Sequence, residues 1–585
     1  TGSLRAATFE TIEQGIAWKM DFDGPETRSG HTVTFSFPIL DADARIFTPS
    51  QYGVMEVRTY PEYTPVPYAF LGWESGQAYV LPLVSVLDEA TDTGLTFALP
   101  PDENIPNLQV AWTNARELTL SLGHRGMGGG TPSPLTLLCF GHKADYRDAL
   151  RVYSDLYPRY FKPGIARGPY EGTFYYHHIQ AHPDFEEMAR QRVRHVWTSF
   201  WFTHLGEYLP DAAEWEPYTY AKWWKLGETM SDARIRDFAR EMHDHGIGVF
   251  AYFNVTEYGG AGGKSGDTAE AARILKERFA DALIRNEKND TVPTWEGAMA
   301  MNCGKKYALW PFLEEQLQRH LKRLPEIDGF DIDRLDWCSV MDYAHDDGLT
   351  MFGERRAENL AVPVGEAIRS ICATAHAADK RVFVNQFYRI EPLCDVDGYV
   401  HENDYLPAMA YLAPYRPAAA WNMRKPYTGD LLQFETQLKR RLQWALFPQM
   451  IAREFPISQQ GANPNAAAML EIYAPLFDTL LGKEQMLLPH CVAVTGANDV
   501  NLFLNGLGYY VAPLTSRIRF MCRDNRATEA AMVLLRTPDA DGLAWAHIYP
   551  ADSPPDAATV AHEVSGEATI QVERHGTASI VVAGS

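Results

Sequence analysis

Three aspartates lie on or just after a short apolar run, residues 327–337, and these are Asp331, Asp333 and Asp336. Successive side chains of a strand face opposite ways, so Asp331 and Asp333 would share one face. If that face lines a barrel, both carboxylates point toward its axis. The alternative is structural, because Asp331 or Asp336 could pair with Arg334 or cap the next turn.

Two carboxylates are enough to hydrolyse a glycosidic bond, because one attacks or activates water while the other protonates the leaving oxygen. Asp333 is the inward-facing acid nearer the strand end, and Glu402 ends a later expected strand. Asp404 is the rival for the second role, and Asp331, one layer deeper, would suit a substrate hydroxyl. The polar stretch 401–404 also allows Glu402 to be a solvated loop carboxylate.

Further polar and aromatic side chains stand at the ends of expected strands, where a sugar could meet stacking surfaces beside hydrogen-bonding groups. Barrel cores also use aromatic residues, so packing is the alternative for each of them. The substrate-binding candidates among them are His177, Trp201, Asn254 and Asn385.

The formal net charge of −22 argues against nucleic acid or an anionic membrane as a partner, since either would favour a basic face. It favours a neutral carbohydrate substrate. Arg334 is the exception, because it follows Asp333 and could reach a sulfate, a carboxylate or Asp336. With Asp336 and Asp404 it completes the set of expected substrate-binding residues.

Seven widely spaced cysteines without a C-x-x-C pair form neither a disulfide framework nor a zinc motif. We therefore expect no cofactor, although a structural calcium ion built from Asp and Asn oxygens stays open. No run of 18 apolar residues and no hydrophobic signal core occur, so we expect a soluble chain. Periplasmic, secreted and cytoplasmic locations stay open, as does the oligomeric state.

The rhythm of the chain changes twice, which predicts three domains. Residues 1–165 alternate like the strands of a β-sandwich and end in a helical stretch at 144–157, residues 166–484 alternate strands with helices, and residues 485–585 are β-rich again. The middle part predicts a (β/α)8 TIM barrel flanked by an N-terminal and a C-terminal β-sandwich. Its expected strands are 172–177, 195–202, 248–254, the aspartate-rich run within 327–337, 381–386, 397–402, 418–422 and 450–455.

The segment Gly329–Arg334 resembles the fourth-strand signature of retaining α-glycosidases of the α-galactosidase superfamily. In that family an acidic nucleophile ends the strand two residues after an inward polar residue, often lysine. The resemblance places the nucleophile on Asp333, Asp331 in the place of the lysine, and the acid/base in 401–404, with Glu402 as our choice.

The domain order is also similar to that of endo-α-N-acetylgalactosaminidase and its smaller relatives. The resemblance implies a glycoside hydrolase that cleaves an α-linked glycan or oligosaccharide with retention of configuration. The alternative is a noncatalytic glycan-binding protein on a glycosidase-like barrel.

Overall fold

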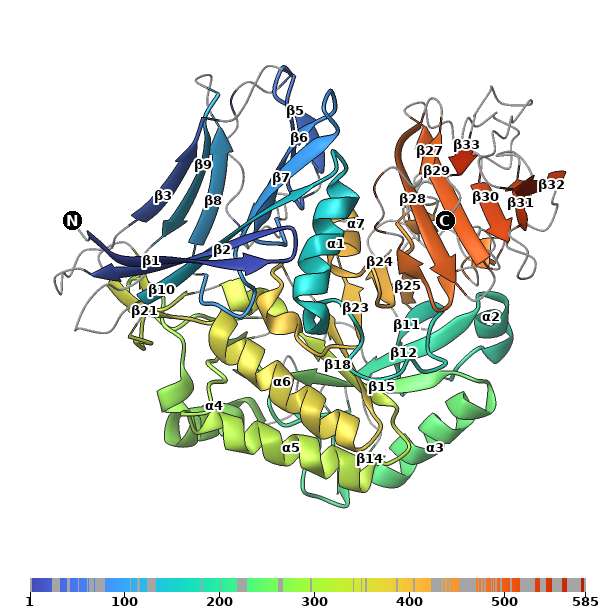
Figure 1. Ribbon diagram of the computed structural model, residues 1–585. Helices are drawn as coiled ribbons and strands as arrows, with labels where there is room; N and C mark the ends of the chain where they lie inside the picture. Colours follow the sequence, from blue (N-terminus) through green and yellow to red (C-terminus); the bar gives the residue numbers. More distant parts are fainter. Residues whose placement is uncertain are drawn as a thin grey trace.

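The computed structural model describes most of residues 3–451, with the longest gaps at 24–31, 69–78, 124–132, 218–228, 261–266 and 422–433. Beyond 451 it describes parts of 470–494 and the strands that follow. Three groups of strands succeed one another along the chain (Figure 1). Among the described residues, no helix combines the length and the apolar character needed to cross a membrane.

The N-terminal part contains two antiparallel sheets. The seven-stranded sheet has the order β1-β2-β10-β7-β6-β4-β5, and the three-stranded sheet the order β3-β9-β8. The strands are β1 Ser3–Ile12, β2 Gly15–Asp23, β3 Thr32–Phe37, β4 Arg45–Phe47, β5 Val54–Glu56, β6 Leu83–Asp88, β7 Thr93–Ala98, β8 Asn107–Trp112, β9 Leu118–Gly123 and β10 Ser133–His142.

One apolar core joins the two N-terminal sheets. Trp112 of β8 and Leu120 of β9 bury their side chains in the same cluster as Val84 of β6 and Leu137 of β10. Two sheets that share a core between their inner faces form a sandwich. The other face of the larger sheet meets α1, Tyr146–Leu156, which links this part to the barrel.

Eight parallel strands close into a barrel in sequence order, as predicted, and the last pairs with the first. They are β11 Thr173–His178, β12 Val193–Ser199, β15 Gly248–Asn254, β18 Gly329–Asp333, β22 Arg381–Asn385, β23 Gly398–His401, β24 Ala418–Trp421 and β25 Phe447–Ile451. The helices that follow in the described segments are α2 Phe185–Arg190, α3 Asp232–Asp244, α4 Asp267–Arg278, α5 Leu309–Arg323, α6 Ala361–Ala377 and α7 Leu406–Leu412. Figure 1 shows α3, α5 and α6 on the outside of the barrel.

The expected elements match the structure closely at the centre of the barrel and less well at its end. Ser231 caps α3 through a hydrogen bond from the backbone N–H of Arg234, as expected from the sequence. The eighth strand begins at Phe447, three residues earlier than predicted. It contains Pro448, which has no backbone N–H to donate to a neighbouring strand. A proline is therefore rarely expected inside a strand, and the prediction began after it.

Short strands lie in the connections that follow the carboxyl ends of the barrel strands. They include a two-stranded pair, β16 Glu257–Gly259 with β17 Ala298–Ala300, and a three-stranded sheet in the order β19-β21-β20. The bounds of the latter are β19 Met341–Asp342, β20 Thr350–Phe352 and β21 Arg355–Asn359, and a further pair joins β13 Glu214–Trp215 to β14 Met230–Ser231. Short 3-10 turns lie at Pro158–Tyr160, Ala280–Ala282, Leu335–Ser339 and Glu391–Leu393.

The C-terminal part is antiparallel, with a six-stranded sheet β26-β28-β29-β30-β31-β32 and a two-stranded sheet β27-β33. Both sheets agree with the expected terminal β domain, while the domain bounds at 165 and 484 stay predictions. The strands are β26 Glu484–Gln485, β27 Val492–Val494, β28 Ala497–Asn505, β29 Gly508–Thr515, β30 Met532–Arg536, β31 Leu543–Tyr549, β32 Val560–Ser565 and β33 Ile580–Val582.

Candidate active site

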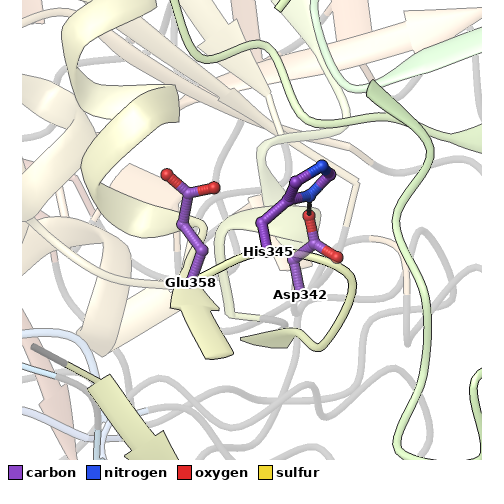
Figure 2. A group of neighbouring side chains, drawn as sticks. All are labelled: Asp342, His345 and Glu358. Atoms are coloured by element: carbon purple, nitrogen blue, oxygen red, sulfur yellow. Dashed lines mark hydrogen bonds and ion pairs between the residues drawn. The ribbon is translucent and has the colours of Figure 1, made fainter. Parts of the chain in front are cut away.

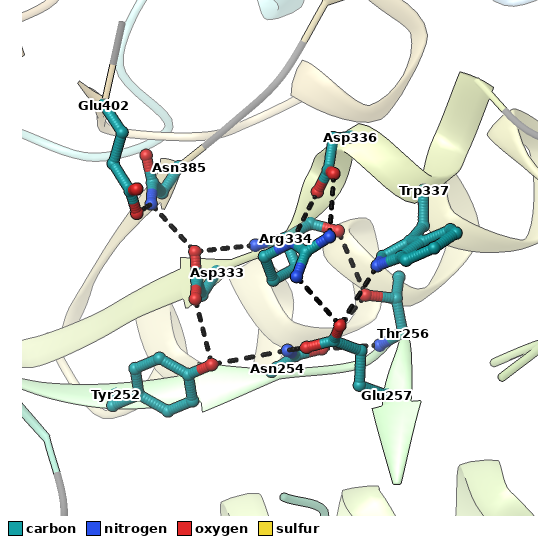
Figure 3. A network of polar contacts seen from close by, with 10 residues as sticks. All are labelled: Tyr252, Asn254, Thr256, Glu257, Asp333, Arg334, Asp336, Trp337, Asn385 and Glu402. Carbon is teal, nitrogen blue, oxygen red and sulfur yellow. Dashed lines mark hydrogen bonds and ion pairs between the residues drawn. The ribbon is translucent and has the colours of Figure 1, made fainter. Parts of the chain in front are cut away.

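Asp333 is the last residue of β18, and hydrogen-bond donors from three sides hold its carboxylate (Figure 3). The Tyr252 hydroxyl of β15 donates to Oδ2 at 2.9 Å, and Nδ2 of Asn385 on β22 donates to Oδ1 at 2.8 Å. The backbone N–H of Arg334 also donates to Oδ1, at 2.8 Å. The side chain is therefore fixed at the carboxyl end of the barrel, where (β/α)8 enzymes carry their chemistry.

Asn385 connects Asp333 to Glu402. Its amide nitrogen donates both to Oδ1 of Asp333, at 2.8 Å, and to Oε1 of Glu402, at 2.9 Å. Two oxygens that share one nitrogen at these lengths can be no further apart than 5.7 Å. Retaining glycosidases separate their carboxyl groups by about 5–5.5 Å and inverting ones by about 6.5–9.5 Å, so this upper limit fits the retaining spacing.

Burial and mutual repulsion separate the two carboxyl groups in acidity. Burial raises the pKa of Asp333 to about 6, against the opposing effect of the Arg334 charge. Burial also raises the pKa of Glu402, and the negative charge of Asp333 raises it further, above that of Asp333. Near neutral pH this order leaves Asp333 ionised and Glu402 protonated, the states that a nucleophile and a general acid require.

Arg334 faces away from this pair and joins a second buried network. Its backbone adopts a left-handed φ of 60°, which turns the chain at the end of β18. The guanidinium donates to both Asp336 oxygens at 2.9 and 3.0 Å and to Glu257 at 3.0 Å, and it lies over the Trp337 ring. Trp337 also donates its indole N–H to Glu257 at 3.2 Å. Asp336 is thus an arginine partner, the structural alternative that the sequence left open.

Asp331 lies one layer below Asp333, as the alternation of the strand predicted. Its carboxylate is buried and lies 2.9 Å from Nε2 of His195, which is itself fully buried. The His195 ring stacks between Phe174 and Phe250 inside the barrel. This position places Asp331 in the barrel core, where contact with a substrate hydroxyl is not available.

The remaining candidates separate into near and distant residues. Asn254 lies close to the site, because its amide contacts Tyr252 and donates to Glu257 at 2.7 Å. His177 instead packs against Phe238 of α3, on the outer side of the barrel wall. Trp201 is buried and lies near His320 of α5, also outside the barrel.

Asp404, the rival for the role of acid, lies outside the described residues. Both His177 and Trp201 lie near the ends of expected strands, which is why their positions suggested the mouth. Their contacts with the surrounding helices place them behind it instead, because neighbouring side chains of a strand alternate between its two faces.

Two residues of the site do not belong to the set of predicted site residues. Tyr252 was noted among the aromatic and amide groups at expected strand ends without a role of its own, and its hydrogen bond to Asp333 now separates it from core residues. Glu257 comes three residues after the end of β15, in a connection without a motif. An acid just beyond a barrel strand is the signal that could have identified it.

Comparisons with known proteins support the fold. No family model and no curated protein sequence matches the chain. Among solved structures, the chain is similar to a cycloalternan-degrading enzyme from Trueperella pyogenes, with a TM-score of 0.56, 12% identity and coverage of 98% of this chain and 84% of that one. It is also similar to the ligand-free α-N-acetylgalactosaminidase NagBb from Bifidobacterium bifidum, with a TM-score of 0.52, 10% identity and coverage of 87% and 91%.

A third similar structure is an aspartate-to-alanine mutant of Kfla1895 in complex with cyclobis-(1->6)-α-nigerosyl, with a TM-score of 0.51, 11% identity and coverage of 81% and 74%. At identities of 10–12%, the structural similarity shows a shared fold. The chemistry of this chain has to be argued from its own residues.

Proposed function

We propose that the protein is a glycoside hydrolase that cleaves an α-linked glycan or oligosaccharide with retention of configuration. Asp333 acts as the nucleophile and Glu402 as the acid/base. The observation that carries this proposal is the Asn385 amide, which holds the two carboxyl groups within 5.7 Å of each other at the mouth of the barrel.

The proposed mechanism has two steps. Ionised Asp333 attacks the anomeric carbon while Glu402 gives its proton to the leaving oxygen, and a covalent glycosyl-enzyme forms. Glu402, now ionised, takes a proton from the water that attacks this intermediate, and Asp333 leaves as a carboxylate. Tyr252 and Asn385 donate hydrogen bonds to Asp333, so they hold its two oxygens in fixed directions throughout.

Properties of the similar structures support the proposal. The Trueperella enzyme has been solved with a covalent intermediate, with isomaltose and with cycloalternan. A covalent intermediate is expected for a retaining enzyme. NagBb is named as an α-glycosidase, and the ligand of the Kfla1895 mutant is an α-nigerosyl sugar. The resemblance of β18 to the α-galactosidase superfamily points the same way.

A neutral sugar is the favoured substrate. Arg334 is the cation next to Asp333. Its guanidinium already donates three hydrogen bonds to the carboxylates of Asp336 and Glu257. An arginine that is already paired with two carboxylates offers little to an anionic substituent. Activity on neutral aryl glycosides is therefore expected to exceed activity on sulfated or uronic ones.

Replacing Asp333 by Asn tests the proposal, because the change removes the nucleophilic charge and keeps the shape. Turnover of an aryl α-glycoside panel should fall at least about a thousandfold. The matched control is Asp346→Asn, at an exposed aspartate that pairs with Arg356, and it should keep the wild-type rate. Near wild-type turnover in Asp333→Asn would exclude the assignment.

Two further measurements distinguish a retaining enzyme from an inverting one and from a noncatalytic glycan-binding protein. The anomeric configuration of the first-formed product, followed by NMR, should match that of the substrate, and inversion would contradict the proposed roles. Binding of glycosides without turnover by the wild-type chain, across the α and β members of the panel, would indicate a noncatalytic glycan-binding protein.

A further inference from the structure

A second group of ionisable side chains lies in the connection between β18 and α6, apart from the Asp333 network. It consists of Asp342 on β19, His345 in the turn that follows, and Glu358 on β21 (Figure 2). Each offers one ligand atom, and these atoms all lie within 4.8 Å of one another. Among the residues that the structure describes, no other group of this kind occurs.

Neighbouring groups orient all three side chains. The Asn302 amide donates to Oδ2 of Asp342 at 3.1 Å and to Oε2 of Glu358 at 2.7 Å, and the Tyr307 hydroxyl donates to the same Glu358 oxygen at 2.7 Å. A backbone carbonyl, that of Asp281, lies within hydrogen-bonding reach of the His345 ring. Metal-binding histidines and carboxylates commonly have such outer partners, which fix the ring and the carboxylate planes.

The charges of the group call for a cation. Asp342 is fully buried and Glu358 is 6% exposed, so both carboxylates are shielded from water. The His345 ring lies 2.5 Å from Oδ2 of Asp342. The ammonium group of Lys306, on a side chain that is half exposed, lies 2.9 Å from Oε1 of Glu358. Buried carboxylates are costly unless a positive charge neutralises them. The Lys306 side chain can turn into water, which would free Oε1 of Glu358 for a metal ion.

We propose that Asp342, His345 and Glu358 bind one divalent transition-metal ion of the zinc type. An imidazole nitrogen beside two carboxylates is a donor set that suits zinc, whereas calcium prefers oxygen ligands alone. Zinc ligands lie at about 2.0–2.2 Å from the metal, so small side-chain movements would close the group around it. A calcium ion, which the sequence left open, is the weaker choice here.

The position of the group suggests that the metal braces the catalytic face. Asn302 and Tyr307 come from the connection before α5, whereas the three ligands come from the connection before α6. A small apolar cluster of Ile284, Ala300 and Leu360 includes residues close in sequence to Asn302 and Glu358, and Trp337 packs against it. Trp337 in turn donates to Glu257, the partner of Arg334. A bound metal would therefore fix the connection before α6, to which Asn302 and Tyr307 tie the connection before α5 by hydrogen bonds.

The test uses the full chain, stripped with a chelator and titrated with zinc chloride in a calorimeter. One equivalent per chain should bind to the wild-type protein. His345→Ala should weaken this binding more than tenfold, because it removes a ligand from a partly exposed position that tolerates truncation. Lys306→Met should strengthen it, because it removes the competitor for Glu358. The second result would not be expected of adventitious binding to surface histidines.

His243→Ala is the matched control. His243 also pairs with an aspartate, Asp328, at 2.7 Å, and is also partly exposed, but it belongs to no such three-donor group among the described residues. Its removal should leave the zinc affinity unchanged. Absence of saturable zinc binding, equal affinity in His345→Ala, or calcium binding tighter than zinc binding would each overturn the proposal. None of these measurements depends on glycosidase activity.

Discussion

Two aspartates on the same strand, two residues apart and facing the same way, have entirely different surroundings. Asp331 lies inside the barrel and has one polar partner among the described residues, Nε2 of His195. Asp333 lies one layer higher and accepts three hydrogen bonds from β15, from β22 and from the backbone. A second carboxyl group, Glu402, shares its Asn385 donor.

The difference shows how a barrel assigns separate roles to identical side chains. The His195 ring lies between Phe174 at 4.0 Å and Phe250 at 3.8 Å, so the Asp331 layer is closed to substrate. At the level of Asp333, the Tyr252 hydroxyl and the Asn385 amide donate hydrogen bonds to the carboxylate, and burial together with the negative charge of Asp333 raises the pKa of Glu402. We therefore expect Asp331 to serve stability and Asp333 to serve the proposed chemistry.

The largest expected effect concerns Glu402, which lies in the upper layer with Asp333. Glu402→Gln removes the proton that the leaving oxygen needs, so turnover of glycosides with poor leaving groups should fall about 10²–10⁴-fold. Substrates with acidic leaving groups should lose much less, because they depart without protonation. The basic limb of the profile of kcat/KM against pH should disappear, since it reports ionisation of Glu402.

Asp404→Asn is the matched change for the rival acid, two residues further along the chain. It should leave the dependence on leaving group and the basic limb as in the wild type. If Asp404→Asn, and not Glu402→Gln, produced the selective loss on poor leaving groups, the acid/base role would pass to Asp404 and the Asn385 bridge would have a structural role only.

The next effect concerns the lower layer. Asp331→Ala leaves His195 without its buried partner and should lower the free energy of unfolding by about 3 kcal/mol. Activity per folded molecule should change less than about tenfold, because Asp331 makes no contact with the reacting atoms. Denaturant unfolding, followed together with kcat/KM at a temperature where the variant is folded, checks both values.

Asp333→Ala should show the opposite pattern, with activity lost and stability affected less, since donors facing the mouth can turn to water. If Asp331→Ala abolished turnover while leaving stability intact, the division of roles between the two layers would be wrong.

The local pattern predicted much of this arrangement from the sequence, and long-range pairing accounts for the rest. Alternation in 329–333 placed Asp331 and Asp333 on one face, and the β/α rhythm predicted the closed eight-stranded barrel, which is confirmed. The pairing of Asp331 with His195 spans 136 positions and depends on how barrel layers stack. No local period encodes such a contact, so the sequence suggested a substrate hydroxyl as the partner instead.

Strand ends show the same limit. Asn385 was predicted at the mouth and lies there, because β22 pairs in parallel with β18 and brings its last residue beside Asp333. His177 and Trp201 also end or follow expected strands, yet their contacts lie with α3 and α5. Whether the last residue of a strand faces into or out of the barrel depends on the register in which the strands pair to close the barrel. The sequence of a single strand does not reveal this register.

The smallest expected effect concerns the donors that set the acidity of Asp333. Tyr252→Phe keeps the buried ring and removes the hydroxyl that donates to Oδ2 at 2.9 Å. That hydrogen bond stabilises the ionised carboxylate and lowers the pKa of Asp333 against the effect of burial. Its loss should raise this pKa, so that the nucleophile becomes protonated at a higher pH.

The acidic limb of the kcat/KM profile, near pH 6 in the wild type, should therefore move upward by about one unit, because a hydrogen bond to a charged group contributes about 1.5 kcal/mol. At the optimum, kcat/KM should fall by about tenfold or less. An acidic limb that stays in place or moves to lower pH would show that Tyr252 supports the barrel wall, as the aromatic residues around Asp331 do, and does not tune the site.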